Sequence, residues 1–181
     1  METIKKNVRK SIVDKLNRLL QVENDLVFNY PQVIDRLVRE ENIDDKQLLE
    51  SIEAGAKESL RHHDEVDKWI GKLGGETIWD VKIVSPSVDV KELMLQQLEK
   101  EKWAISWYNS VKKIAEQNKV NAAGIIGRVM GSGNVLPEDF VNVDEFINML
   151  ERHIADEERH IKICLHAVEI LSVLKNKQHN V

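Results

Sequence analysis

The chain has few of the residues that a disulfide-stabilised, metal-finger or membrane protein would need. It contains one cysteine, Cys164, which excludes an internal disulfide and also the paired Cys-x-x-Cys knuckles of a rubredoxin-type iron centre or zinc site. No stretch approaches the roughly 18 uncharged apolar residues of a membrane span, and the N-terminus METIKKNVRK lacks the apolar core of a signal peptide. We therefore expect a cytoplasmic protein without a membrane segment.

Prolines and the residue alternation typical of strands are also scarce. The chain has three prolines, and its apolar residues recur at spacings of three and four, the period of an amphipathic helix. Its net charge of −5, from 31 acidic and 26 basic side chains, gives no overall reason to expect nucleic-acid binding. A length of 181 residues suits one domain with a core of its own. We predict a single all-α domain over residues 1–181.

The apolar stripes predict four helices, over residues of about 3–37, 45–73, 89–118 and 142–174. Pro31 falls inside the first stripe, where it removes a backbone donor, so we expect that helix to kink or stop there. Gly74-Gly75 should end the second helix. Residues of about 119–141 contain four glycines and Pro137, and they are predicted to form an insertion with room for one or two helical turns. Residues 175–181 form a polar tail.

The segment between the second and third helices determines the topology. Residues 78–84 lack a helical period and indicate extended chain, which ends at Pro86. A dozen or so extended residues reach roughly 40 Å, the length of a helix of about 27 residues. That length can return the chain from one end of a bundle to the other. The second and third helices are therefore predicted to run parallel in a four-helix bundle with a long crossover.

The only two tyrosines occupy equivalent positions. Tyr30 lies seven residues after Glu23, and Tyr108 lies seven residues after Glu101, on the apolar stripes of the first and third helices. Seven residues is close to two helical turns, so each glutamate shares a face with its tyrosine. A carboxylate that faces a helical core is costly unless it is paired or binds a metal. Both glutamates are therefore candidate metal ligands.

The fourth helix carries Glu157 and His160, which lie three residues apart and so are neighbours on one face. Inward glutamates combined with a Glu-x-x-His pair are the ligand arrangement of a di-iron four-helix bundle. Carboxylate oxygens suit iron, and imidazole adds a nitrogen ligand. We predict that Glu157 and His160 converge with Glu23 and Glu101 at the middle of the bundle.

These residues give the chain a resemblance to the ferritin-like superfamily, above all to bacterioferritins and the di-iron domain of rubrerythrins. The resemblance rests on Leu19-Leu20-Gln21-Val22-Glu23 with Tyr30, on Glu101 with Tyr108 and on Asp156-Glu157-Glu158-Arg159-His160-Ile161. It covers nearly the whole chain outside residues 121–141. It implies that Glu23 and Glu101 are terminal carboxylate ligands. It also implies a bridging carboxylate at Glu157 and an imidazole ligand at His160, with Tyr30 and Tyr108 as hydrogen-bonding partners of the ligands. The two tyrosines are the candidate catalytic side chains.

The second helix departs from the family pattern. The family has another Glu-x-x-His pair there, but Ser59 stands three residues before His62, and Leu60 stands three before His63. Neither Ser nor Leu can bridge two metal ions. We favour His62 over His63 as the ligand from this helix, because His62 shares the face of Ser59. Glu58, four residues before His62, becomes a ligand if the helix rotates slightly.

Two functions of different classes follow. A di-iron centre can deliver two electrons to O2 or peroxide, which indicates a ferroxidase or a peroxide- or O2-reducing oxidoreductase. Iron is the expected metal, and another divalent metal on the same ligands is the alternative. The alternative is a non-catalytic binding or structural protein with a degenerate metal site, which Ser59 favours. The expected partners are Fe(II), O2 or peroxide, and further copies of the chain in a homo-oligomer of two or more.

Overall fold

The computed structural model describes residues 2–79, 89–129 and 143–178, with the side chains of residues 8–79, 89–117 and 143–175. Over these residues the chain forms four α-helices and no strand. The helices are α1 (Glu2–Arg39), α2 (Lys46–Lys72), α3 (Val90–Val129) and α4 (Val143–Gln178). The prediction of an all-α chain of four helices is confirmed.

The ends of α2 and the start of α3 have the local chemistry that the sequence indicated. The Asp45 carboxylate accepts a hydrogen bond from the backbone N–H of Leu48 at 3.0 Å, which caps the N-terminus of α2. Gly74 follows the last turn of α2 with a φ of 72°, a left-handed conformation that glycine adopts without steric cost. Asp89 accepts from the backbone N–H groups of Lys91 and Glu92 at 3.0 and 3.3 Å.

The first helix was predicted over residues of about 3–37, with a kink or a stop at Pro31. The structure excludes the stop, because α1 continues through Pro31 to Arg39. Residues on both sides of Pro31, including Tyr30 and Val33, are buried in the same apolar cluster, and this packing offsets the missing backbone hydrogen bond.

The third helix does not end near Asn118, because α3 continues to Val129. The added part of α3 contains Gly124 and Gly127, and a single glycine inside a helix costs only about 1 kcal/mol. The adjacent Ala122-Ala123 has the highest helix propensity. Residues 130–142 of the predicted insertion lie outside the described part of the chain.

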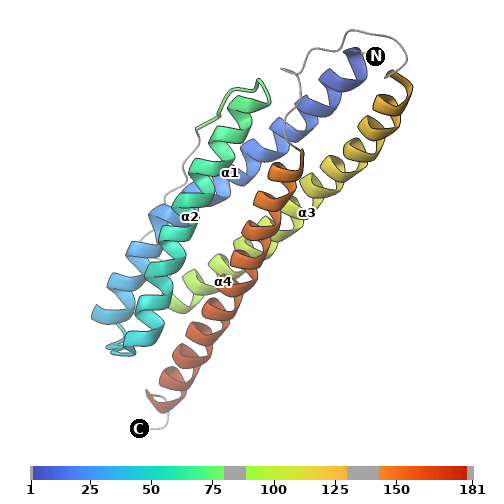
Figure 1. Ribbon diagram of the computed structural model, residues 1–181. Coiled ribbons are helices and arrows are strands. Elements are labelled where there is room, and N and C mark those ends of the chain that lie inside the picture. The colour runs from blue at the N-terminus through green and yellow to red at the C-terminus, as the bar shows by residue number, and fades with distance from the viewer. Residues whose placement is uncertain (1, 80–88, 130–142, 179–181) are drawn as a thin grey trace.

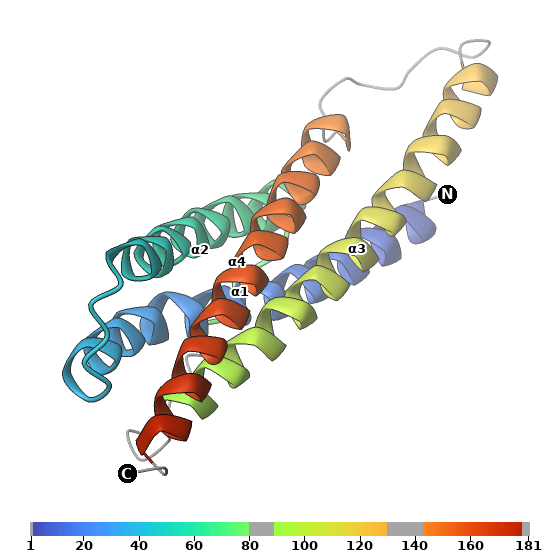
Figure 2. The same cartoon turned by 90° about the horizontal axis from the view of Figure 1, so that it is seen from below.

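The helices pack in a four-membered arrangement in which α1 contacts α2, α3 contacts α4, and the two pairs meet through α1 with α3 and α2 with α4. Figures 1 and 2 show α2 and α3 running in one direction and α1 and α4 in the other. The end of α2 and the start of α3 lie at opposite ends of the bundle (Figure 1). The predicted parallel pair with a long crossover is therefore confirmed, although residues 80–88 of that crossover lie outside the described residues.

Two apolar clusters occupy the two ends of the core. One contains Leu16, Leu19, Val66, Tyr108 and Phe146, and the other contains Leu26, Tyr30, Ile52, Leu93 and Leu171. In every helix the residues between the two clusters include buried polar side chains. These are Glu23 in α1, Ser59 and His62 in α2, Glu101 in α3, and His153, Glu157 and His160 in α4. A polar layer thus crosses the middle of the bundle.

Candidate metal centre

The polar layer contains two groups of side chains whose ligand atoms all lie within 4.8 Å of one another. The first group is Glu23, His62 and Glu157, and the second is Glu101, Glu157 and His160. All five residues are buried, with at most 1% of any of them exposed. Glu157 belongs to both groups, so the two form one continuous site.

The Glu157 carboxylate lies between the two imidazole rings. Its Oε1 is 3.0 Å from Nδ1 of His62, and its Oε2 is 2.8 Å from Nδ1 of His160. Each oxygen of Glu157 therefore faces a different group of ligands. This is the position that a carboxylate bridging two metal ions requires.

The tyrosines hold the other two glutamates from the opposite helix. The hydroxyl of Tyr108 in α3 donates to Oε1 of Glu23 in α1 at 2.7 Å, and the hydroxyl of Tyr30 in α1 donates to Oε1 of Glu101 in α3. The Oε2 atom of each glutamate is buried and has no hydrogen-bond partner among the described residues. A buried carboxylate oxygen without a partner is costly, and a metal ion would satisfy it. The residues therefore fit a pair of cations.

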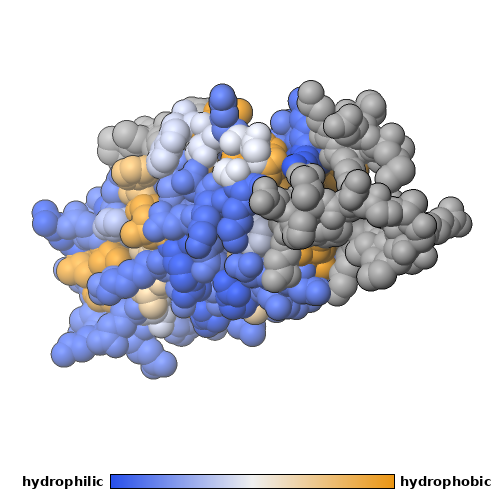
Figure 3. Space-filling model, turned by 45° about the horizontal axis from the view of Figure 1, so that its top comes forward, coloured by the Kyte–Doolittle hydropathy of each residue, from blue (hydrophilic) through white to orange (hydrophobic). Residues whose placement is uncertain are grey.

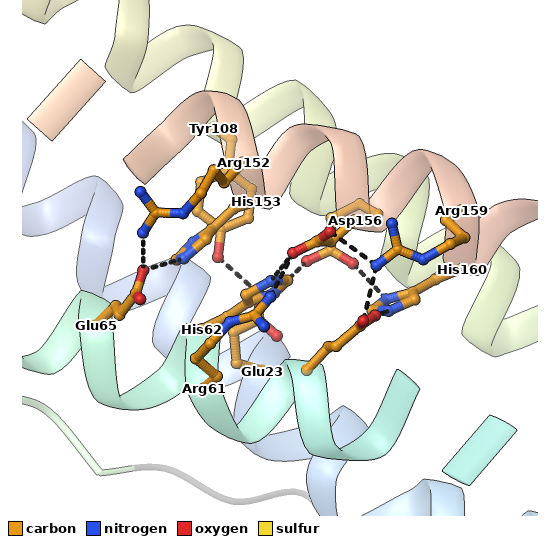
Figure 4. Close-up of polar contacts among 12 residues, drawn as sticks. Glu23, Arg61, His62, Glu65, Tyr108, Arg152, His153, Asp156, Arg159 and His160 are labelled. Atoms are coloured by element: carbon orange, nitrogen blue, oxygen red, sulfur yellow. Dashed lines mark hydrogen bonds and ion pairs between the residues drawn. The ribbon is translucent and has the colours of Figure 1, made fainter. Parts of the chain in front are cut away.

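The outer nitrogen of each imidazole contacts a second carboxylate (Figure 4). Nε2 of His62 is 3.1 Å from Asp156, and Nε2 of His160 is 2.8 Å from Glu58. An arginine holds each of these carboxylates in turn: Arg61 bonds to Asp156 and Arg159 bonds to Glu58. A carboxylate on the outer ring nitrogen orients the ring and presents Nδ1 to the interior.

The carboxylates strongly perturb the pKa values inside the layer. Burial alone lowers the pKa of His62, but Glu23 and the neighbouring carboxylates outweigh it and raise that pKa to about 12. Burial is likewise outweighed at His160, where Glu101 and Glu157 raise the pKa to about 11. Burial and the two other glutamates raise the pKa of Glu157 well above its usual value. Protons thus offset the repulsion between the carboxylates when no cation does.

The same arrangement occurs in both halves of the chain. Within each helix the spacing is the same in both halves, and the corresponding positions are Glu23 and Glu101, Tyr30 and Tyr108, Glu58 and Asp156, Arg61 and Arg159, and His62 and His160. Two positions break this correspondence. Ser59 stands where the other half has Glu157, and Gly55 stands where it has His153. Ser59 is fully buried, and its hydroxyl has no hydrogen-bond partner among the described residues.

His153 was not among the predicted ligands, although it lies beside the site. Its ring stacks on that of His62 with centroids 4.0 Å apart. Its Nε2 is 2.8 Å from Glu65, which Arg152 also contacts at 2.9 Å. A histidine that contacts a carboxylate held by an arginine therefore occurs a third time, after His62 and His160 (Figure 4). Burial and the nearby His62 lower the pKa of His153 to about 4, which keeps this ring neutral.

The structure brings together five of the six predicted ligands: Glu23, His62, Glu101, Glu157 and His160. The sixth, Glu58, lies in neither group and contacts the outer nitrogen of His160. His63 contacts Asp64 and packs against Trp79, away from both groups. The sequence contained a signal for His153, which precedes Glu157 by four residues and so lies on the same face of α4.

A comparison with solved structures identifies the fold. The chain matches a crystal structure described as ferritin-like, diiron-carboxylate proteins from Bacillus anthracis str. Ames, with a TM-score of 0.65 and 20% sequence identity. The match covers 89% of this chain and 97% of the other. The fold is ferritin-like. No family model and no curated protein matches the chain. The assignment therefore concerns the fold and rests on the structural comparison.

Proposed function

We propose that this ferritin-like protein binds a pair of iron ions at mid-bundle and uses them as an oxidoreductase. The observation that carries the proposal is the double contact of Glu157, whose two oxygens lie against Nδ1 of His62 and Nδ1 of His160. Glu23 completes one group of ligand atoms and Glu101 completes the other. The structural neighbour is described as a diiron-carboxylate protein, which supports iron as the metal.

The donor atoms suit iron. Each proposed ion would have one glutamate of its own, one imidazole and a share of Glu157, a mixture of oxygen and nitrogen ligands that iron accepts. A pair of ferrous ions can supply two electrons to O2 or peroxide. Tyr30 and Tyr108 would hold the terminal carboxylates in position, while the apolar clusters on both sides of the layer limit access of water.

Iron binding and oxidation test the proposal in one preparation. The metal-free protein would be titrated with Fe(II) under anaerobic conditions, and bound iron measured by elemental analysis. We expect two ions per chain. Exposure to O2 or peroxide should then oxidise the bound Fe(II) faster than Fe(II) in buffer alone. Glu157→Gln should abolish both, whereas Glu158→Gln, at the adjacent exposed position of α4, should change neither.

The buried Ser59 in place of a second bridging glutamate supports an alternative, a binding or structural protein without redox activity. The same experiment separates the two. Two bound ions without accelerated oxidation would favour the binding protein. A chain that binds no iron or other divalent metal would favour the structural role.

A further inference from the structure

Ser59 leaves one position of the metal centre without a protein ligand. In α4, Glu157 precedes His160 by three residues, and in α2, Ser59 precedes His62 by the same interval. Both imidazoles contact Glu157, so α2 presents the His62 face to the site, and Ser59 shares that face. The Ser59 side chain is fully buried, and its hydroxyl finds no partner among the described residues. A buried hydroxyl without a partner indicates a missing one.

The difference between the two side chains defines the size of that missing partner. Serine Oγ occupies the place of glutamate Cγ, so what serine lacks is a carboxylate carbon with its two oxygens. Formate is the smallest free molecule with that group. A serine hydroxyl can also donate a hydrogen bond to a carboxylate oxygen.

Charge favours an anion at the same position. Two divalent cations carry four positive charges, whereas the glutamates of the two groups, Glu23, Glu101 and Glu157, supply three negative charges. The other nearby carboxylates, Asp156 and Glu58, are already paired with arginines. One positive charge would remain in a buried site, which is unfavourable unless an anion offsets it.

We propose that the loaded site takes one small external carboxylate of formate size, which bridges the two ions opposite Glu157 and accepts a hydrogen bond from Ser59. This inference rests on the proposed two-metal site. It adds a ligand class, a small monoanionic carboxylate, to that site. A bound water or hydroxide in the same place is the competing outcome.

The experiment uses the protein loaded with zinc, which has no redox chemistry, and elemental analysis first establishes two zinc ions per chain. Sodium formate is then titrated into this protein and into the metal-free protein by calorimetry at constant ionic strength, with sodium chloride as the reference salt. We expect saturable binding of one formate per chain in the zinc form and none in the metal-free form.

Three variants of Ser59 test the position itself. Ser59→Glu should abolish formate binding and, without formate, tighten the weaker zinc ion at least about tenfold, because it supplies the missing carboxylate. Ser59→Gln fills the same volume without charge, so it should abolish formate binding and leave zinc affinity unimproved. Ser59→Ala keeps the space and removes only the hydroxyl, so formate should bind roughly tenfold more weakly.

The outcomes separate this inference from the proposed function. A protein that binds two zinc ions but no formate, or whose formate binding survives Ser59→Gln, overturns the inference and leaves the metal centre intact. A protein that binds no zinc overturns both. If Ser59→Glu fails to fold, Ser59→Gln and Ser59→Ala still decide between a bound carboxylate and a bound water.

Discussion

At the scale of single residues, each tyrosine hydroxyl determines which oxygen of a glutamate is available to a cation. Tyr108 donates to Oε1 of Glu23, and Tyr30 donates to Oε1 of Glu101, so in both glutamates Oε2 is the oxygen without a hydrogen bond among the described residues. Oε2 of Glu101 lies 3.6 Å from Nδ1 of His160. The hydrogen bonds cross between α1 and α3. Each tyrosine therefore links the two helices and positions a proposed ligand on the helix that it faces.

This arrangement predicts that the two tyrosines act on different ions. Tyr108→Phe should weaken the ion at Glu23, and Tyr30→Phe should weaken the ion at Glu101, each by roughly 10- to 100-fold, the usual effect of losing a hydrogen bond to a ligand. Stepwise titration with Co(II), monitored by its visible absorption, would measure both affinities. The two variants serve as controls for each other. Equal loss at both steps in both variants would contradict separate roles.

The imidazoles predict proton release on metal binding. The pKa values of His62 and His160 in the folded protein, about 12 and 11, lie above their ordinary 6.5, so both rings are protonated at neutral pH without metal. A cation needs the Nδ1 lone pair and must displace those protons, so metal affinity should rise with pH. Conversely, the stability that the charged rings give the metal-free protein is complete below about pH 6.5 and is lost as pH rises through about 11 to 12.

Calorimetric titration with zinc in two buffers of different ionisation enthalpy measures this release. We expect about three protons per chain at pH 7, one from each ring and one from Glu157, whose raised pKa favours the uncharged form without metal. His62→Gln should reduce the number by about one, whereas His63→Gln, beside it on α2 and outside both groups, should not. Equal heats of binding in the two buffers would show that the rings are neutral before metal binds.

The sequence predicted most of the inner residues of the site and the tyrosines that position the glutamates, but not the carboxylates Asp156 and Glu65 that contact the histidines. The glutamates and tyrosines were identifiable because two copies of one spacing fell on apolar stripes, and spacing is a local property of a helix. The contacts of Asp156 with His62 and of Glu65 with His153 join α2 to α4. Such contacts depend on how two helices are aligned along their lengths, which a single sequence does not reveal.

At the scale of helices, the N-terminal cap stabilises α2, the helix that carries Ser59 and His62. The Asp45 carboxylate accepts from the backbone N–H of Leu48 and so satisfies one of the free donors at the start of the helix. Asp45→Ala should lower the free energy of unfolding by about 1 kcal/mol. Asp44→Ala, at the exposed preceding residue, should change it by less than about 0.5 kcal/mol. Urea denaturation monitored by circular dichroism would measure both.

Helix starts were easier to predict than helix interruptions. The starts of α2 and α3 follow from Asp45 and Asp89, whose side chains act on the next few residues. Whether α1 continues past Pro31 depends on tertiary packing that offsets a local penalty of a few kcal/mol. The continuation of α3 past Asn118 agrees with local propensity, because its glycines cost little and its alanines favour a helix. Local rules therefore placed the caps correctly, but the end of the third helix was predicted too early.

At the scale of the whole molecule, the described part of the surface combines a hydrophilic face with scattered exposed apolar side chains. The face in Figure 3 is mostly hydrophilic, with apolar residues in small, separate groups. Among the described residues, exposed large apolar side chains include Phe28, Leu60 and Trp79. None of the described helices combines the length and the apolar character that a membrane crossing needs. The homo-oligomer and the cytoplasmic location stay predictions, and light scattering would measure the oligomeric state.

The polar layer also predicts that the stability of the whole bundle depends on metal. Mid-bundle carboxylates repel one another in a buried environment, and metal that binds only the folded chain stabilises it by mass action. A free metal concentration of 100 times the dissociation constant contributes about 2.7 kcal/mol. For a chain of this size that energy corresponds to a rise of roughly 5 to 10 °C in melting temperature.

We therefore expect zinc or Fe(II) under anaerobic conditions to raise the melting temperature of the metal-free protein by that amount. Glu157→Gln should remove the rise, because glutamine cannot bridge two cations. It should leave the melting temperature without metal near that of the unchanged protein, since the raised pKa of Glu157 already favours an uncharged side chain there. Glu158→Gln should retain the full rise. An unchanged melting temperature across several divalent ions would show that the layer serves the fold alone.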